Sequence, residues 1–329
     1  MPRIVVLSPL PEEAVKAMLS ERPESEGLDL EVSVYSGEPG KELEEAVKGS
    51  DVIIGDFSFR LPIDEGVAVA ARDCRLIQQP SIGYQHVDLE ATRREGIPVA
   101  NVGAANAIGV AEHAIMFMLM LLKRALYFHH KTAGGEWGQQ DIFTLGTREL
   151  YGKVLGIVGM GSIGKEVARR ARPFGCRTVY SDPVPLSSEM EEELGVEEMG
   201  LEELLGVSDI VSLHVPLTPE TRHLIDAEKL GLMKPEAFLL NLARGEVLDE
   251  AALADALREG RIAGAGIDVF TEEPLNPDNP LIESEKVVLS PHVAGGTNES
   301  RVRIIQATVE NVARVLSGEK PRNVVNGVV

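Results

Sequence analysis

Residues 153–182, KVLGIVGMGSIGKEVARRARPFGCRTVYSD, constrain the fold of this chain more than any other stretch. The apolar run 154–158 is short and β-branched, which is typical of a buried parallel strand. Gly159, Gly161 and Gly164 follow it at the spacing of a dinucleotide fingerprint and lead into a segment with the apolar spacing of a helix. A second predicted strand then ends at Asp182, 18 residues after Gly164. The stretch therefore predicts a βαβ unit that binds a dinucleotide.

Each part of this fingerprint has a physical task. Gly159 permits a tight turn, Gly161 lets a pyrophosphate approach the backbone, and Gly164 lets helix and strand pack closely. The helix N-terminus presents free N–H groups and a positive dipole end to the phosphates. A carboxylate at Asp182 would bind ribose hydroxyls and repel a 2′-phosphate, so we expect NAD rather than NADP. A glycine-rich turn alone is also compatible with a purely structural role, but its place between strand and helix favours the cofactor.

Composition excludes several classes of protein. The net charge of −20 would repel nucleic acid and anionic lipid, so neither is expected as a partner. Two cysteines give neither a disulfide framework nor metal-ligand spacing, and no metal site is expected. The N-terminus has too short an apolar run for a signal peptide, and the apolar run 114–122 is too short to span a bilayer. We therefore expect a cytoplasmic protein, without a regulatory domain after Val329.

Strand-like and helix-like segments alternate along the chain, which predicts two doubly wound α/β domains with parallel sheets. A chain of 329 residues is long enough for both cores. No fingerprint occurs in residues 1–100, so the dinucleotide domain is expected at residues 101–292. A helix over 300–316 comes too late to extend the second sheet, and we expect residues 293–329 to complete the first domain. A substrate cleft is expected between the two domains.

The expected elements follow the apolar runs and the capping residues. In the first domain we expect strands at 4–7, 30–34, 52–54, 76–78 and 98–100, and helices at 11–19, 41–47, 65–71 and 89–94. After the fingerprint unit we expect strands at 210–213, 238–240, 266–269 and 287–289, with helices after Thr218-Pro219 and from Asp249 to Arg258. The acidic run 189–205 is interpreted as a solvated face with apolar spacing.

The segment AIGVAEHAIMFMLMLLKRAL, residues 107–126, predicts a helix with almost no polar face. A helix that is apolar all round must be buried on every side. In a chain of this size we expect one side to pack on its own domain and the other on a second subunit. The sequence therefore predicts a homodimer built on the helix from Val110 to Leu126.

Three polar residues each follow a predicted strand of the dinucleotide domain: Arg244, Glu273 and His292. In an open α/β sheet the carboxyl ends of the strands border the ligand crevice. Each residue taken singly is more often structural, because loop arginines form ion pairs and lone histidines are satisfied in cores. Together they predict a catalytic group beside the cofactor. In the first domain the loop 79–84 occupies the corresponding edge, although turn residues are often without function.

At this point the chain resembles a known family. The segments GMGSIG, HVPLTPETRHLI, NLARGEVLDEAAL, GIDVFTEEP and PHVAGGT stand in the order found in D-isomer-specific 2-hydroxyacid dehydrogenases. SIGYQHVD in the first domain and VAEHAIMFMLMLLKR in the connecting helix extend the resemblance over nearly the whole chain. The resemblance implies a flavodoxin-like substrate domain built from both chain ends, a central Rossmann domain for NAD, and a homodimer.

The resemblance also implies catalytic roles. Arg244 matches the arginine that binds the carboxylate and carbonyl of the substrate, His292 the acid/base, and Glu273 its carboxylate partner. Reduction of a 2-oxo acid by hydride produces an alkoxide that needs a proton, which an imidazolium within hydrogen-bond reach supplies. A neighbouring carboxylate favours the charged imidazole. A guanidinium matches a planar carboxylate with two hydrogen bonds and keeps its charge.

The remaining roles are likewise implied by the resemblance. Backbone N–H groups around Ile82 and Gly83 would hold the substrate carboxylate. The cofactor would be held by the fingerprint glycines and by a further set of residues, namely Ser162 and Ile163 at the pyrophosphate, Asp182 at the ribose, His214, Val215, Pro216 and Ala243 along the cleft, and Asp268 and His292 to Gly295 at the nicotinamide end.

The substrate is less constrained. Gln85 stands where the family often has Asp, and residues 102–104 lack a common proline. Members that act on phosphoglycerate carry an arginine after the third strand, whereas here the nearest base is Arg60. We therefore expect a short substrate such as glyoxylate or hydroxypyruvate, with D-3-phosphoglycerate as the alternative. A protein of another class, an NAD(H)-sensing corepressor of related fold, is the second alternative; no long Ser/Pro-rich tail supports it.

Overall fold

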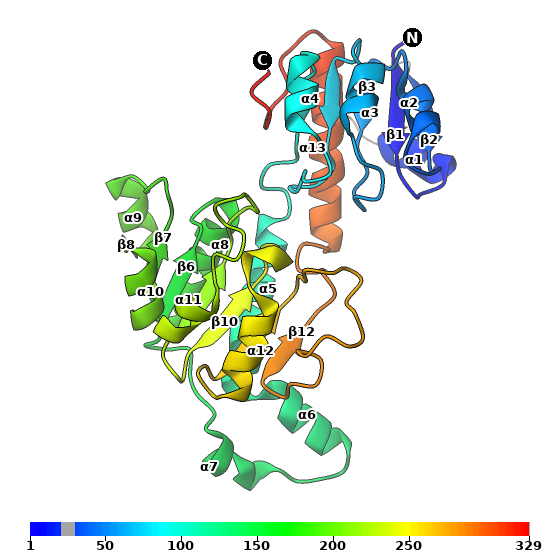
Figure 1. Ribbon diagram of the computed structural model, residues 1–329. Coiled ribbons are helices and arrows are strands. Elements are labelled where there is room, and N and C mark those ends of the chain that lie inside the picture. Colours follow the sequence, from blue (N-terminus) through cyan, green and yellow to red (C-terminus); the bar gives the residue numbers. More distant parts are fainter. Residues whose placement is uncertain (21–29, 329) are drawn as a thin grey trace. The chain divides into compact units, whose positions relative to one another are not determined.

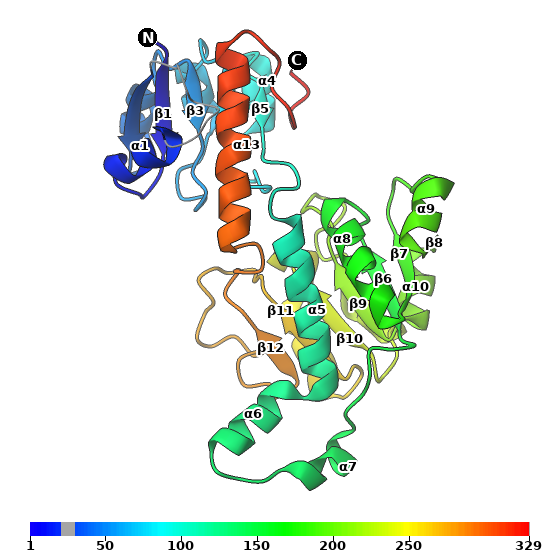
Figure 2. The ribbon, with the colours of Figure 1, turned by 180° about the vertical axis from the view of Figure 1, so that it is seen from behind.

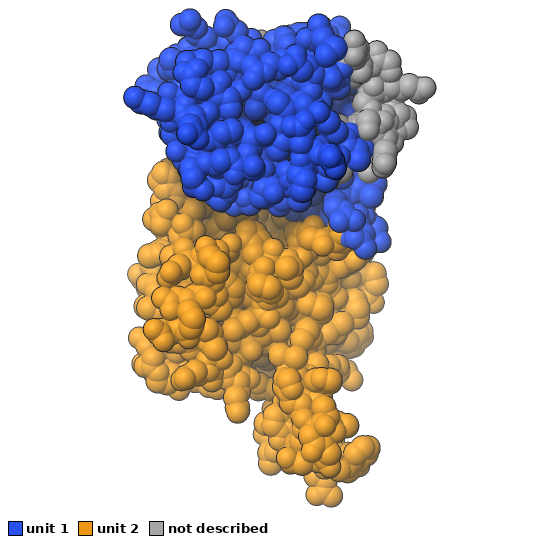
Figure 3. All heavy atoms as spheres, turned by 90° about the vertical axis from the view of Figure 1, so that its right-hand side faces the viewer, with its two compact units in different colours: residues 1–106, 298–329 blue, residues 107–297 orange. Residues whose placement is uncertain are grey.

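The computed structural model describes residues 1–20 and 30–328, which form two compact units. Unit 1 contains residues 1–106 and 298–329, and unit 2 contains residues 107–297 (Figure 3). The unit boundaries lie a few residues beyond the expected 100 and 292, and hydrogen bonds attach residues near both boundaries to their units. Asn101 donates from its backbone to the carbonyl of Asn323 (3.1 Å), within unit 1. Val293 and Ala294 donate to the carboxylate of Asp268, within unit 2.

Unit 1 is built on a parallel sheet with the strand order β2-β1-β3-β4-β5 (Figure 1). This is the flavodoxin-like order that the resemblance implies. The strands are β1 (Arg3–Leu7), β2 (Glu31–Tyr35), β3 (Val52–Ile54), β4 (Leu76–Gln78) and β5 (Val99–Ala100). The helices are α1 (Glu12–Ser20), α2 (Lys41–Val47), α3 (Glu65–Ala70), α4 (Leu89–Arg94) and α13 (Asn298–Leu316).

Both faces of this sheet are covered by apolar side chains. One core joins the sheet to Leu43 and Val47 of α2 and to Val67 of α3. The other joins it to Val15 of α1 and to Val312 of α13. The returning helix α13 is also tied to β4, because Asn311 Nδ2 donates to Gln78 Oε1 (2.8 Å) in the interior. The loops after β3, β4 and β5 therefore follow strands in which every residue is buried.

Unit 2 is built on a seven-stranded parallel sheet with the order β12-β11-β10-β9-β6-β7-β8. Read from β8, this is the doubly wound Rossmann order, and its direction reverses between β6 and β9, where ligands bind in such sheets. The strands are β6 (Val154–Val158), β7 (Arg177–Ser181), β8 (Val196–Glu198), β9 (Ile210–Leu213), β10 (Phe238–Asn241), β11 (Gly264–Ile267) and β12 (Val287–Leu289). The helices are α5 (Ala107–Lys123), α6 (Ala125–Ala133), α7 (Ile142–Leu145), α8 (Ser162–Ala171), α9 (Ser188–Leu194), α10 (Leu201–Val207), α11 (Ala227–Leu232) and α12 (Glu250–Arg258).

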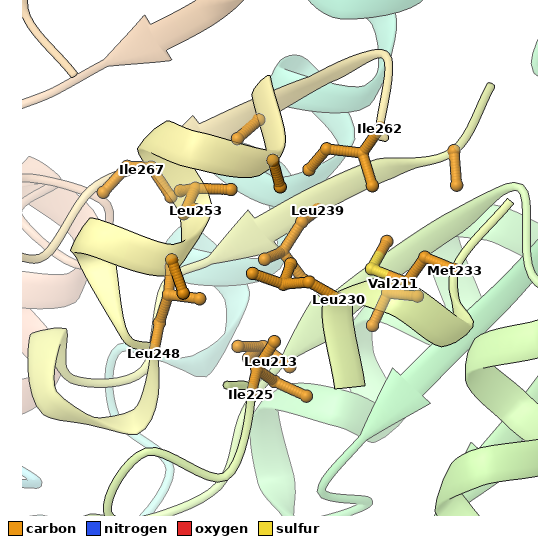
Figure 4. Close-up of a cluster of buried hydrophobic side chains, with 14 of the residues drawn as sticks. Val211, Leu213, Ile225, Leu230, Met233, Leu239, Leu248, Leu253, Ile262 and Ile267 are labelled. Atoms are coloured by element: carbon orange, nitrogen blue, oxygen red, sulfur yellow. The ribbon is translucent and has the colours of Figure 1, made fainter. Parts of the chain in front are cut away.

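Two apolar cores cover the faces of the seven-stranded sheet. Figure 4 shows the first, in which Leu230 of α11 and Leu253 of α12 pack on Val211 and Leu239 of the central strands. The second core lies on the other face, beneath α5 and α8. The fold class predicted from the sequence, two parallel-sheet α/β domains of which one is a Rossmann domain, is confirmed.

Some expected elements are wrong in detail. No helix follows Thr218-Pro219, because the hydroxyl of Thr221 closes a turn there by accepting from Thr218 N (2.7 Å) and donating to Pro216 O (2.6 Å). The helix begins only at Ala227, after the cap Asp226. The acidic run 189–205 contains the edge strand β8 between two helices, which the acidic composition obscured. The strand expected at 266–269 is β11, Gly264–Ile267.

Helix α5 is buried mainly by its own unit. Ten of its residues are buried, including Phe117 and Met118, and the helix packs on α8 and on three strands of the sheet. It ends at Lys123 because Arg124 takes a left-handed conformation (φ 52°). Packing within unit 2 therefore accounts for most of the apolar composition of α5, and a second subunit is not needed to bury the helix. None of the helices in the described residues has the length and apolar character needed to cross a membrane.

The segment after α5 leaves the body of unit 2. Helices α6 and α7 extend away from the sheet in both ribbon views (Figure 2), and neither contains a buried residue. This segment, residues 125–151, exposes three large aromatic side chains: Trp137 (82%), Phe143 (84%) and Tyr151 (75%).

Candidate functional site

The fingerprint turn between β6 and α8 is shaped by its glycines. Gly159 has φ +96°, and a Cβ there would lie 2.7 Å from the carbonyl carbon of His214. At Gly164 a Cβ would lie 2.3 Å from the carbonyl oxygen of Gly159. At Gly161, by contrast, no atom lies within 4 Å of the Cβ position. The first and last glycines thus allow tight backbone packing, while the middle one leaves open space at the helix N-terminus.

That open space fits a pyrophosphate. Gly161 is the N-cap of α8, whose first helical bond runs from Lys165 N to Gly161 O (3.1 Å). The N–H groups of Ser162, Ile163 and Gly164 precede that bond and have no helical acceptor, so they are available to phosphate oxygens at the positive end of the helix.

Asp182, at the end of β7, is oriented by the same turn. Its Oδ2 accepts from Met160 N (2.7 Å) and its Oδ1 from Val184 N (2.8 Å). A carboxylate has about four lone-pair sites, so acceptor capacity remains for two ribose hydroxyls. The residues present at β6, α8 and β7 therefore fit the adenosine half of NAD.

His214 follows β9 and packs against the fingerprint through its backbone. Its N–H donates to Val158 O (2.7 Å), and its buried ring pairs through Nε2 with the Ser212 hydroxyl (2.8 Å). Burial lowers the pKa of His214 to about 3, so the ring is neutral at physiological pH. Val215 and Pro216 continue this loop, and the side chain of Val215 lies against Gly159.

Arg244 follows β10 on a loop held by Asn241. The Asn241 side chain donates to Arg244 O (2.9 Å) and accepts from Ala243 N (3.1 Å). The next residue, Gly245, lies so close to the 270–271 backbone that a Cβ would be 2.0 Å from the carbonyl carbon of Phe270. This contact brings the loop that carries Arg244 against the loop that carries Glu273. Burial lowers the pKa of Arg244, against the opposing effect of Glu273, but a guanidinium stays charged.

Glu273 and His292 form a hydrogen-bonded pair. His292 Nδ1 lies 2.7 Å from Glu273 Oε2, and Glu273 Oε1 accepts from Phe270 N (3.0 Å). Burial raises the pKa of the Glu273 carboxyl, but the hydrogen bonds from His292 and Phe270 N and the charge of Arg244 outweigh it, leaving the pKa below its usual value. Glu273 is therefore ionised near neutral pH and accepts the Nδ1 proton. Among the described residues no hydrogen-bond partner meets the Nε2 atom of His292, so this atom can exchange a proton with a ligand.

The conformation of His292 is unusual. Its φ of 53° lies in the left-handed region, which costs a non-glycine residue about 1–2 kcal/mol. Its backbone N–H donates to the carbonyl of Asp268 (2.7 Å), and the following N–H groups of Val293 and Ala294 donate to the Asp268 carboxylate (3.0 and 2.9 Å). Asp268, expected at the nicotinamide end, thus has its carboxylate engaged by the loop that carries His292.

Two residues of this network were not among the expected site residues. The hydroxyl of Ser290 donates to Asp268 Oδ1, and His113 of α5 lies with Nε2 3.0 Å from the same hydroxyl. His113 lies in the expected helix 107–126, whose apolar sequence predicted only a packing role. The one available signal was a polar ring at position 113 of an otherwise apolar helix face.

In unit 1 the loop after β4 contains Ile82 and Gly83. Its carbonyls accept side-chain donors, Ile82 O from Asn101 Nδ2 (3.0 Å) and Gly83 O from Ser81 Oγ (2.7 Å). In the part of the chain that the structure describes, no acceptor within hydrogen-bond distance meets the N–H of Ile82 or Gly83. Two free N–H groups on a braced loop are suited to a carboxylate.

The base that follows β3 has other partners. Arg60 donates to the carbonyls of Gly37 (2.8 Å) and Ser36 (3.0 Å) and pairs with Glu38 (3.4 Å). On the same loop, the buried carboxylate of Asp56 accepts from the backbone and hydroxyl of Ser58. The loop after β3 therefore contains a buried carboxylate and an arginine that is already bonded to Ser36, Gly37 and Glu38.

No cluster of three or more His, Cys, Asp or Glu side chains suited to a metal ion occurs in the described residues. The two cysteines are free thiols: Cys74 is buried and Cys176 is partly buried. Burial raises the pKa of each to about 11, so both are unreactive near neutral pH.

A Rossmann sheet with a dinucleotide fingerprint, together with an arginine, a glutamate and a histidine at the carboxyl ends of its strands, defines a dinucleotide-dependent dehydrogenase. The comparison with known proteins identifies the family of dehydrogenases. Residues 115–294 match the NAD binding domain of the D-isomer specific 2-hydroxyacid dehydrogenases, and the chain belongs to that family. It is an NAD-dependent dehydrogenase.

Similar proteins are found over nearly the full chain. The glyoxylate reductase of Korarchaeum cryptofilum is 39% identical over 328 residues, which are 99% of this chain and 96% of that protein. The D-3-phosphoglycerate dehydrogenase of Methanocaldococcus jannaschii is 37% identical over 99% of this chain but only 60% of that protein. The crystal structure of the TT0316 protein from Thermus thermophilus superposes with a TM-score of 0.83 at 36% identity, covering 98% of this chain and 99% of that one.

Proposed function

We propose that this dehydrogenase interconverts glyoxylate and glycolate, or hydroxypyruvate and D-glycerate, with His292 as acid/base, Glu273 as its partner and Arg244 as the substrate-binding cation. The observation that carries the catalytic assignment is the 2.7 Å bond between His292 Nδ1 and Glu273 Oε2, on a loop adjacent to that of the half-buried Arg244. This arrangement leaves Nε2 of His292 and the positive charge of Arg244 available to the substrate.

NADH, when bound, supplies the hydride. Hydride addition to the 2-oxo carbon places negative charge on its oxygen, and the protonated Nε2 of His292 neutralises that charge by donating a proton. The Glu273 carboxylate stabilises the imidazolium through Nδ1 and fixes the ring orientation. In the oxidative direction the neutral imidazole accepts the hydroxyl proton at Nε2 while Nδ1 remains bonded to Glu273.

Arg244 would hold the substrate through its carboxylate. One of its terminal nitrogens donates to the carbonyl of Ala243 (2.6 Å), which fixes the guanidinium plane and leaves the remaining donors free. For unit 1 we propose that the free N–H groups of Ile82 and Gly83 bind a substrate carboxylate. The remaining assignments, Ser162, Ile163, Asp182, His214, Val215, Pro216, Ala243, Asp268 and Gly295 at the cofactor, are part of this proposal.

The loop after β3 supports an unphosphorylated substrate. A phosphorylated substrate needs a free cation, whereas Arg60 is bound to two carbonyls and to Glu38. Asp56 adds negative charge to the same loop, and the similar glyoxylate reductases match this chain over nearly their whole length. These observations favour a small, unphosphorylated 2-oxo acid over 3-phosphohydroxypyruvate, the substrate expected of a phosphoglycerate dehydrogenase.

A panel of 2-oxo acids tests the proposal. NADH oxidation is followed by absorbance with glyoxylate, hydroxypyruvate, pyruvate and 3-phosphohydroxypyruvate, using the wild type and Arg60→Gln. We expect the highest kcat/KM with glyoxylate or hydroxypyruvate and no effect of Arg60→Gln on either. Preference for 3-phosphohydroxypyruvate that is lost in Arg60→Gln would assign the alternative activity, and negligible turnover of every 2-oxo acid would favour an NAD(H)-sensing protein.

We also propose a homodimer. Support comes from Trp137, Phe143 and Tyr151, whose exposure on the segment 125–151 is costly for an isolated chain. Met116 of α5 and Leu126 of α6 are 41% and 37% exposed, so they can contribute to the same interface. Light scattering should give twice the chain mass of 35.6 kDa, and Phe143→Asp should lower it. A cytoplasmic location and the lack of a nucleic-acid partner stay predictions.

A further inference from the structure

A chain of hydrogen bonds connects helix α5 to the loop that carries His292. His113 Nε2 lies 3.0 Å from Ser290 Oγ, and Ser290 Oγ is bonded to Asp268 Oδ1. The Asp268 carboxylate also accepts from Val293 N and Ala294 N, at 3.0 and 2.9 Å. Three donors from residues 290–294 therefore surround one buried carboxylate, and His113 is the outermost member of the network.

The direction of these bonds follows from the donors available. A carboxylate accepts only, and Ser290 has a single hydroxyl proton, which it donates to Asp268. The contact between Ser290 and His113 must then be donated by His113, from Nε2–H. His113 is largely buried, with its ring edge against Phe117 (centroids 4.5 Å apart). Burial lowers the pKa of His113, although Asp268 opposes this effect, so a neutral ring with its proton on Nε2 satisfies every member.

The network acts on the backbone of His292. Ser290 and the two residues after His292 are attached to the same carboxylate, while His292 N donates to the Asp268 carbonyl (2.7 Å). These bonds enclose the one residue of the loop with a left-handed φ. If the loop relaxed, the imidazole would move away from Glu273 and from the substrate.

We propose that His113 is a positioning residue for His292, acting through Ser290 and Asp268. The proposal rests on the proposed role of His292 as acid/base. His113 touches no reacting atom; its Nε2–H fills the acceptor site of Ser290, which keeps the hydroxyl proton directed at Asp268 and the 290–294 loop closed around the carboxylate.

Two substitutions separate the hydrogen bond from the packing. His113→Phe keeps a ring beside Phe117 but removes the donor, while His113→Gln places an amide N–H near the Nε2 position. We expect His113→Phe to lower kcat for reduction about tenfold, the rate equivalent of one hydrogen bond, with the KM for the 2-oxo acid and the NADH dissociation constant unchanged. His113→Gln should recover most of the lost rate. Ser290→Ala should lower kcat similarly, and the double variant should be no slower than either single one.

A purely structural His113 would give a different pattern. It would lower the melting temperature equally in both variants and leave kcat intact, or lower kcat equally in both. Either result, or additive effects of His113→Phe and Ser290→Ala, would overturn the proposal.

The proton position provides a test that needs no substrate. In the wild type labelled with ¹⁵N-histidine, two-bond imidazole correlations should show His113 as the Nε2–H tautomer, with the resonance assigned by its loss in His113→Gln. An Nδ1–H tautomer would refute the bond direction. If no 2-oxo acid is turned over but the Nε2–H tautomer is found, the network stands and the proposed function fails.

Discussion

Replacing Glu273 with glutamine tests the pair on which the proposed chemistry depends. The amide is nearly isosteric, and its oxygen still accepts from His292 Nδ1, at the position where Oε2 now lies 2.7 Å away. The ring therefore keeps its orientation, while the negative charge beside it is lost and the amide NH2 replaces the acceptor of the hydrogen bond from Phe270 N. Without that charge the protonated imidazole, the form that donates to the substrate, loses its stabilising partner.

The size of the effect follows from geometry and exposure. A hydrogen bond to a charged group contributes about 1.5–3 kcal/mol. Because 38% of the His292 side chain and 37% of the Glu273 side chain are exposed, solvent screens the pair, and we take the lower end, about 1.5 kcal/mol. At about 1.4 kcal/mol per factor of ten, Glu273→Gln should lower kcat/KM for reduction about tenfold at about pH 7.

The assay is steady-state reduction of glyoxylate at saturating NADH, from mildly acidic to mildly alkaline pH. The matched control is Glu272→Gln, which removes the same charge one residue away, from an exposed side chain that contacts Asn276 and not His292. We expect Glu273→Gln to show the tenfold deficit, while Glu272→Gln follows the wild type. Equal kcat/KM for wild type and Glu273→Gln across this range would refute the role assigned to the pair.

Four further predictions follow from named contacts. His292→Ala should lower reduction by about 10²–10⁴ while NADH still binds by fluorescence titration; near-full turnover would remove His292 as proton donor. Gly161→Ala should weaken NADH binding but keep the melting temperature, because its Cβ enters open space at the helix N-terminus. Gly164→Ala should lower the melting temperature, because its Cβ would lie 2.3 Å from a carbonyl oxygen. An equal loss of stability in both variants would contradict this distinction. NADH should be strongly preferred to NADPH, and Asp182→Ala should narrow the preference; equal rates of the wild type with both cofactors would refute the role of the carboxylate. Burial lowers the pKa of His86 to about 4. The neutral ring therefore contributes its full stability above the unfolded pKa near 6.5, and this contribution is lost as the pH falls toward 4. In urea unfolding, the free energy of unfolding of His86→Phe should fall less steeply than that of the wild type over this pH range.

Much of the fold could be predicted because its signals are local. Short apolar strands such as 52–54 and 210–213 are buried on both faces, and their boundaries coincide with the structure. The cap Asp249 and helix α12 were expected at the same residues, since the carboxylate accepts from Ala252 N (3.0 Å) within one turn. The helix expected after Thr218 failed because the same residue types also stabilise turns. There a bridge between Ile225 and Leu248, distant in sequence, keeps the chain extended.

The sequence by itself determined the chemical groups and the strand ends that carry them: the fingerprint glycines, Asp182, Arg244, Glu273 and His292. Parallel strands bring their carboxyl ends to one edge of a sheet, so residue type and strand position are sufficient for that part. Only the tertiary structure decided how these groups are held. The contact of His113 with Ser290 spans 177 positions along the chain, and the left-handed φ of His292 depends on donors arranged around Asp268. Such bonds join elements through packing of α5 on the sheet, and no local pattern of residues encodes them.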